Sequence, residues 1–143
     1  TIASGAFTSI QLWDSQSGDQ KPLKNLIGKS NAFAFSPDGK TIASGGSSTI
    51  QLWDSQSGAE IKTLTGHNGS VHSVAFSPGG RTIASCGFDR TIKLWDSQSG
   101  ALIKTLTGEY IVDSVAFSPD GNTLASCSYK TIKLWDVSAL ATP

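Results

Sequence analysis

The chain has 143 residues, the length of one domain, and its 38% hydrophobic content is enough for a packed core. Eleven Lys and Arg residues balance eleven Asp and Glu residues, so no basic field exists for a phosphate backbone, and nucleic-acid binding is not expected. No stretch approaches the roughly 18 consecutive apolar residues of a membrane span, so no membrane partner is expected either. The two cysteines are too few for a disulfide scaffold, which favours reduced thiols and a cytoplasmic location. Met is absent even at position 1, which predicts an excised, processed or engineered segment.

Three short motifs recur along the chain with a common period. The string TIAS or TLAS begins at Thr1, Thr41, Thr82 and Thr123, at spacings of 40, 41 and 41 residues. The motif LWD contains all four tryptophans, at Trp13, Trp53, Trp95 and Trp135. FSP recurs every 41 residues, at Phe35, Phe76 and Phe117. A fixed period of about 40 residues indicates a repeat architecture built from one supersecondary unit.

Each period is expected to contain four short strands joined by tight turns. In the third period the strands are VHSVAFS from Val71, TIASCG from Thr82, TIKLWD from Thr91 and LIKTLT from Leu102. SPDG and SQSG place Pro and Gly where hairpin turns need a fixed or a positive φ. Taken along the chain, the pattern predicts three strands, then four, four and three. The corresponding units are a partial one at 1–27, complete ones at 28–66 and 67–108, and a partial one at 109–143.

A four-stranded sheet with two apolar faces cannot bury itself, so the units must stack face to face. The phrases TGHNGSVHSVAFSP, ASCGFDRTIKLWD and SQSG of the third repeat resemble the WD-repeat β-propeller family, in its repetitive bacterial form. The resemblance implies an all-β fold of four-stranded antiparallel blades. Since propellers close with about four to eight blades, we expect either part of a longer propeller or a ring closed by association of copies.

The resemblance also implies a buried structural network within a blade. Its members map to His67, Ser85, Asp89 and Trp95, and the set is complete only in the third repeat. A Ser, a His and an Asp also suggest a nucleophilic triad, which needs an exposed nucleophile and an oxyanion hole. Strand alternation puts Ser85 on the same side as Ile83, within a packed sheet. We therefore expect a structural role and no catalysis.

The function implied by the resemblance is a non-catalytic scaffold that binds proteins or peptides through its loops. The turns between second and third strands and the loops into first strands meet at one end of the sheets. The candidate partner-binding residues there are Phe7, Phe88, Tyr110, Tyr129, Ser70 and His72. Exposed aromatics are favoured interface anchors. His72 would be alone as a metal ligand, so neither a metal nor another cofactor is expected.

Two other functions remain open. The chain could be a regulatory or targeting segment of a larger signalling enzyme, such as a kinase or a nucleotide hydrolase, with the activity elsewhere. It could also bind a small ligand in the channel of the propeller. An open reading frame that ends at both termini would exclude the first, and a ligand screen with no thermal shift would count against the second.

Overall fold

The computed structural model describes residues 2–6, 9–13, 16, 24–27 and 32–140, and within them it contains fourteen strands in four antiparallel sheets. The first sheet has β1 (Ile2–Ala6), β2 (Ser9–Trp13) and β3 (Lys24–Ile27). The second has β4 (Ala32–Phe35), β5 (Thr41–Gly45), β6 (Thr49–Asp54) and β7 (Glu60–Thr65). The third has β8 (Val71–Phe76), β9 (Thr82–Gly87), β10 (Thr91–Asp96) and β11 (Leu102–Thr107). The fourth has β12 (Val112–Phe117), β13 (Thr123–Ser128) and β14 (Ile132–Asp136), followed by the 3₁₀ helix η1 (Ser138–Leu140).

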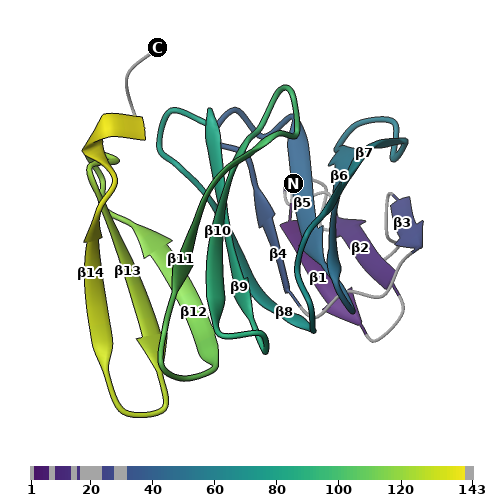
Figure 1. Ribbon diagram of the computed structural model, residues 1–143. Helices are drawn as coiled ribbons and strands as arrows, with labels where there is room; N and C mark the ends of the chain where they lie inside the picture. The colour runs from purple at the N-terminus through teal and green to yellow at the C-terminus, as the bar shows by residue number, and fades with distance from the viewer. Residues whose placement is uncertain (1, 7–8, 14–15, 17–23, 28–31, 141–143) are drawn as a thin grey trace.

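The sheets follow one another as neighbouring layers of an arc, with the first sheet at one end and the fourth at the other (Figure 1). Contacts between β4 and β8 and between β8 and β12 join successive sheets through their first strands. The all-β class and the succession of three, four, four and three strands are both confirmed. No helix among the described residues is long and apolar enough to cross a membrane.

Side-chain hydrogen bonds close the turns between strands. In the turn after β4, the Asp38 carboxylate accepts hydrogen bonds from the Ser36 hydroxyl at 2.6 Å and the Lys40 amide at 2.9 Å. Gly39 follows with a φ of 73°, a conformation that glycine adopts without a steric penalty. In the turn after β6, Asp54 Oδ1 accepts hydrogen bonds from the amides of Gln56 and Ser57, both at 2.9 Å. The Asp-containing turns are therefore closed by hydrogen bonds between residues that are near one another in the sequence.

Three apolar clusters fill the junctions between sheets, and all three are built alike. In each cluster, an Ile and a Leu from the LWD-containing strand of one sheet (β2, β6 or β10) pack against the Trp-bearing face of the following sheet. Between the first and second sheets, Ile10 and Leu12 meet Ile42 and Trp53. The same positions supply the other two clusters, with Ile50, Leu52, Ile83 and Trp95 in one and Ile92, Leu94, Leu124 and Trp135 in the other. Each sheet is therefore stabilised by its neighbours, which is the packing of propeller blades.

Candidate functional site

Four polar side chains form a hydrogen-bonded network in the interior of the third sheet. His67 Nε2 lies 2.7 Å from Ser85 Oγ, and His67 Nδ1 lies 2.9 Å from Asp89 Oδ2. Trp95 Nε1 donates to the same Ser85 Oγ at 2.8 Å. Ser85 and the His67 side chain are completely buried. The network thus joins the loop before β8 with β9, the turn after it, and β10.

One arrangement of protons satisfies every member of this network. If neutral His67 carries its proton on Nδ1, it donates to Asp89 and accepts the Ser85 hydroxyl proton at Nε2. Ser85 Oγ then still accepts from Trp95. Because Ser85 has no exposed surface, no substrate can reach its hydroxyl. The hydrogen bonds of Ser85, His67 and Asp89 therefore lie within the packed interior, as the structural role expected from the sequence would require.

Burial sets the ionisation of the two titratable members. Desolvation lowers the pKa of His67 below its usual 6.5, although the hydrogen bond and charge of Asp89 partly offset this. Burial raises the pKa of Asp89, but hydrogen bonds from the Asn68 amide, Thr91 and the histidine outweigh it and lower the pKa to about 2. The network is therefore a neutral imidazole beside a carboxylate at neutral pH.

The lowered pKa of His67 predicts a loss of stability in mild acid. Unfolded chains take up the imidazole proton near pH 6.5, whereas folded chains resist it, so stability falls as the pH drops below about 7. His67→Gln should be less stable at pH 7 and should lose this slope. Urea unfolding of both chains at several pH values measures the effect. Parallel pH dependence in the two chains would contradict it.

The β9–β10 and β13–β14 turns lie at the same end of the third and fourth sheets (Figure 1). A cleft of about 440 Å³ opens between the two sheets at this end. Six side chains line it, and they are His72, Arg90, Tyr110, Ile111, Asp113 and Tyr129. Tyr129 is 83% exposed and Tyr110 is 42% exposed. The cleft is therefore aromatic and open to solvent.

Two β-bulges contribute to the cleft. The pairing of β8 with β9 shifts register between Val71 and Ser73, and that of β12 with β13 shifts between Val112 and Ser114. The residues skipped are His72 and Asp113, and a bulge re-aims a side chain out of the regular alternation. His72 Nδ1 and Asp113 Oδ1 lie 3.9 Å apart. Equivalent positions of adjacent sheets are thus brought together at one wall of the cleft.

Arg90 holds a fixed backbone position at the rim of the cleft. Its φ is 67°, the only positive value among the described non-glycine residues. Its carbonyl oxygen accepts the Gly108 amide at 2.8 Å, which ties the β9–β10 turn to the loop that leads into β12. No carboxylate forms an ion pair with its guanidinium within the described part of the chain. Arg90 therefore brings a guanidinium without an ion-pair partner into a cleft that also holds the Asp113 carboxylate.

The comparisons with known proteins agree with this architecture. A family model described as the first beta-propeller of IFT122 matches residues 29–142. The chain belongs to this β-propeller family. The resemblance to WD-repeat propellers is confirmed as well. A search of the curated proteins found no match.

The structure brings only some of the residues expected on the partner-binding face of the propeller together in the cleft. Three of them, His72, Tyr110 and Tyr129, meet in the cleft. Phe88 is 59% exposed in the β9–β10 turn and lies outside the cleft lining. Ser70 is half-buried, and its carbonyl oxygen accepts the Phe88 amide. Phe7 lies outside the described residues.

Sequence reasoning missed three residues that line the cleft of the propeller: Arg90, Ile111 and Asp113. Aligning VHSVAFSP with VDSVAFSP puts Asp113 at the position of His72, which was a usable signal. Arg90 carried no comparable signal, because its position depends on a backbone conformation that few non-glycine residues adopt.

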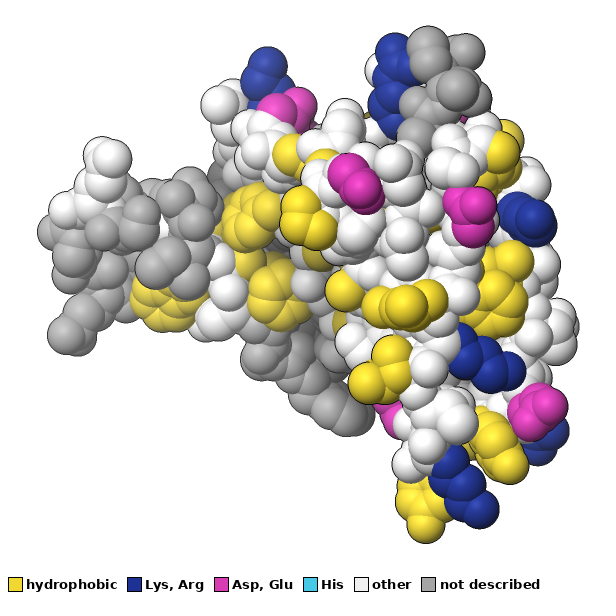
Figure 2. Space-filling view, turned by 90° about the vertical axis from the view of Figure 1, so that its left-hand side faces the viewer, with side chains coloured by type: hydrophobic (Ala, Val, Ile, Leu, Met, Phe, Trp, Pro, Cys, Tyr) yellow, Lys and Arg dark blue, Asp and Glu magenta, His cyan; other side chains and the backbone are white. Residues whose placement is uncertain are grey.

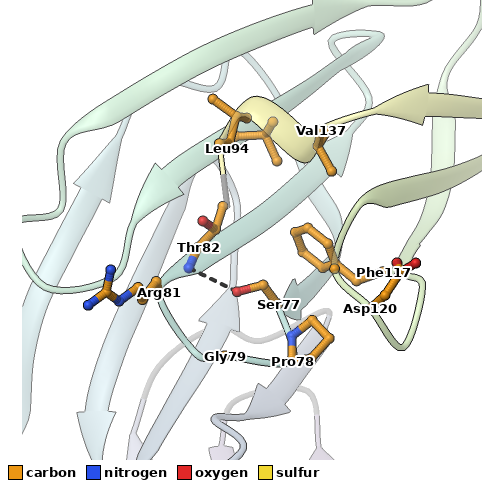
Figure 3. Close-up of a pocket in the computed structure, with 11 residues that line it drawn as sticks. Ser77, Pro78, Gly79, Arg81, Thr82, Leu94, Phe117, Asp120 and Val137 are labelled. Carbon is orange, nitrogen blue, oxygen red and sulfur yellow. Dashed lines mark hydrogen bonds between the residues drawn. The ribbon is translucent and has the colours of Figure 1, made fainter. Parts of the chain in front are cut away.

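A second cavity of the propeller lies at the opposite end of the same junction and measures about 200 Å³. Its apolar wall comes from Leu94, Phe117, Val137 and Leu140, with Arg81 and Asp120 on either side (Figure 3). At the preceding junction, the turn with Ser97 and Gln98 makes the equivalent hollow polar. This cavity is smaller than the roughly 300–1,000 Å³ of most small-molecule sites.

The part of the propeller that the structure describes has no group of three or more His, Cys, Asp or Glu residues that could hold a metal ion. The candidate site is the cleft between the third and fourth sheets, because exposed tyrosines and charged side chains meet there. These groups can bind a ligand through apolar contacts and ionic interactions.

Proposed function

We propose that this propeller is a non-catalytic scaffold that binds a peptide segment of a partner protein in the cleft between its third and fourth sheets. The single observation that carries the proposal is the convergence of Tyr110, Tyr129 and Arg90 on one open cleft. The family supports a protein-interaction scaffold in general, without naming a partner.

The chemistry of the cleft indicates what the peptide would offer. Tyrosines bury much apolar area with few rotatable bonds, so they anchor an apolar or aromatic side chain at low entropic cost. The guanidinium of Arg90 presents a planar set of donors that suits a carboxylate. An acidic residue near an apolar one is therefore the expected pattern of the peptide.

Removal of both aromatic anchors should weaken the binding of such a peptide. Peptides would be selected from a displayed library on the wild-type chain and their affinities then measured by titration calorimetry. Tyr110→Ala/Tyr129→Ala is expected to weaken binding at least about tenfold, since anchors of this kind are each worth about 1–2 kcal/mol. The melting temperature should stay near wild type, because neither Tyr110 nor Tyr129 belongs to the apolar clusters between the sheets.

Ile61→Ala is the matched control, since Ile61 is 52% exposed on β7 in the second sheet. It should leave the affinity unchanged. Enriched peptides that bind the double variant as tightly as the wild type would overturn the choice of cleft. A library from which nothing is enriched would overturn peptide binding itself.

A further inference from the structure

The loop that leads into β8 contains an asparagine directly followed by a glycine. Among the asparagines of the sequence, which are Asn25, Asn31, Asn68 and Asn122, glycine follows Asn68 alone. A backbone amide nitrogen can attack the side-chain carbonyl carbon of the asparagine before it, and a side chain on the attacking residue hinders the approach. Gly69 has no side chain, and its backbone is conformationally permissive. The sequence therefore makes Asn68 and Gly69 the most reactive of these pairs.

The structure leaves both reacting groups of this pair free. Asn68 is exposed, and its carboxamide has no hydrogen-bond partner within the described part of the chain. The Gly69 amide has none among the described residues either. The nucleophile and the electrophile can therefore meet without the loss of a hydrogen bond.

Asn122 provides the contrast within the same chain, in the turn after β12. It is exposed like Asn68, but the amide that follows it is held. The Thr123 amide donates to Ser118 Oγ at 3.0 Å, and threonine is β-branched, which crowds the attacking nitrogen. Asn122 is therefore expected to stay intact under conditions in which Asn68 reacts.

The reactive pair lies against the buried network of the third sheet. The Asn68 amide donates to Asp89 Oδ2 at 2.9 Å, and the same oxygen lies 2.9 Å from His67 Nδ1. A Cβ at Gly69 would lie 3.3 Å from the Phe88 Cβ and 3.5 Å from the Asp89 amide nitrogen. Figure 2 shows no histidine side chain on the face that it draws, in keeping with the complete burial of the His67 side chain. A change at position 68 thus reaches a buried group through a single carboxylate.

We propose that Asn68 is a site of spontaneous deamidation and that the product loosens the buried network around His67. The Gly69 nitrogen bonds to Asn68 Cγ, the Cγ–Nδ2 bond breaks, and ammonia leaves with the proton of the Gly69 nitrogen. Water then opens the resulting succinimide ring at either carbonyl. Opening at Cγ leaves an aspartate, and opening at the backbone carbonyl leaves an isoaspartate. Only water is consumed, and nothing is oxidised or reduced.

Both products disturb the contact with Asp89. The aspartate adds a carboxylate next to the one that accepts the Asn68 amide, and like charges at short range repel. The isoaspartate runs the backbone through Cγ and so inserts one more carbon atom into the loop. The extra atom separates the Asn68 amide, bound to Asp89, from the Ser70 carbonyl, which accepts the Phe88 amide. The deamidated chain is therefore expected to unfold at a lower urea concentration.

Ageing of the full chain in mildly alkaline buffer tests the reaction. Tryptic peptides 63–81 and 105–130 contain one asparagine each, Asn68 and Asn122, so one digest reports on both. Compared with the unaged chain, peptide 63–81 should convert to an aspartate and an isoaspartate form, while peptide 105–130 stays unchanged. Asn68→Gln should stop the conversion, because its longer side chain would have to close a larger ring. Equal conversion of the two peptides would contradict the proposal.

A urea-denatured sample gives the reference rate. Conversion in the folded chain is expected within about tenfold of that rate, whereas a reaction limited to unfolded molecules would be slower by about 10³ or more. A folded chain that keeps the amide at position 68 while the denatured chain loses it would overturn the site, because the fold would then protect it.

Urea unfolding tests the effect on the network. The aged chain, separated from the fresh one by its added charge, and Asn68→Asp should both have a lower midpoint than the wild type. Asn68→Gln adds no charge and is the matched control, with a midpoint near wild type. In an Asp89→Asn chain, Asn68→Asp should no longer lower the midpoint, since the second charge is gone. An unchanged midpoint in both the aged chain and Asn68→Asp would refute the loosening of the network.

Discussion

Replacing Gly87 by alanine is expected to lower the free energy of unfolding by about 3 kcal/mol, at the upper end of the range for overpacking. A Cβ at this position would overlap the carbonyl oxygen of Ser70 and lie 3.1 Å from the Val71 Cα. Both atoms belong to the backbone, so no side-chain rotation relieves the clash. The hydrogen bond from the Phe88 amide to the same carbonyl, 2.9 Å long, would also be lost.

Urea unfolding of Gly87→Ala beside Gly79→Ala measures this effect. A Cβ at Gly79 meets nothing within 4 Å, so the control should change stability by less than about 0.5 kcal/mol. Ser128 holds the corresponding position in the fourth sheet, where the loop into the first strand is one residue shorter. The prediction therefore concerns the third sheet and its longer loop. Equal stability of the two alanine variants would contradict the prediction, because it would show that the backbone at Ser70 and Val71 can move away from the new Cβ at little cost.

Trp95→Phe is expected to lower the free energy of unfolding by about 1–3 kcal/mol, because it removes a buried hydrogen-bonding group. Ser85 Oγ would lose the hydrogen bond that it accepts from the indole N–H. Because Ser85 is completely buried, solvent cannot supply another donor. The Ser85 hydroxyl also holds His67 Nε2, so the loss affects the whole network.

The other sheets provide the comparison for Trp95→Phe. Trp53 and Trp13 each donate to one serine, Ser44 and Ser4, without an imidazole beyond it. Trp53→Phe should therefore cost less than Trp95→Phe, and Trp13→Phe least, since Trp13 is half-buried and Ser4 is exposed. Denaturant unfolding of the three variants gives the order. Equal losses would refute a network whose strength differs from sheet to sheet.

The two expected sites of the propeller differ in how far the sequence revealed them. The buried network could be placed through the resemblance to WD-repeat propellers, whereas repeat alignment alone does not reveal it, because His67 and Asp89 have no counterparts in the other repeats. The cleft could be predicted only in part. Exposed aromatics in the loops indicated Tyr110 and Tyr129, but Arg90 depends on a positive φ and Asp113 on a bulge. Neither the positive φ nor the bulge can be recognised from the alternation of polar and apolar residues along a strand.

The sequence by itself determined the repeated unit and its strands and turns, because these depend on local pattern and on a period of about 40 residues. The members of the buried network came from the resemblance to WD-repeat propellers. Only the tertiary structure decided which copies of that unit are covered. Ile92 and Leu94 are fully buried, whereas Ile132 and Leu134 are exposed, although both pairs stand in the same TIKLWD string. Burial depends on the neighbour that a sheet packs against, and a local pattern does not contain that neighbour.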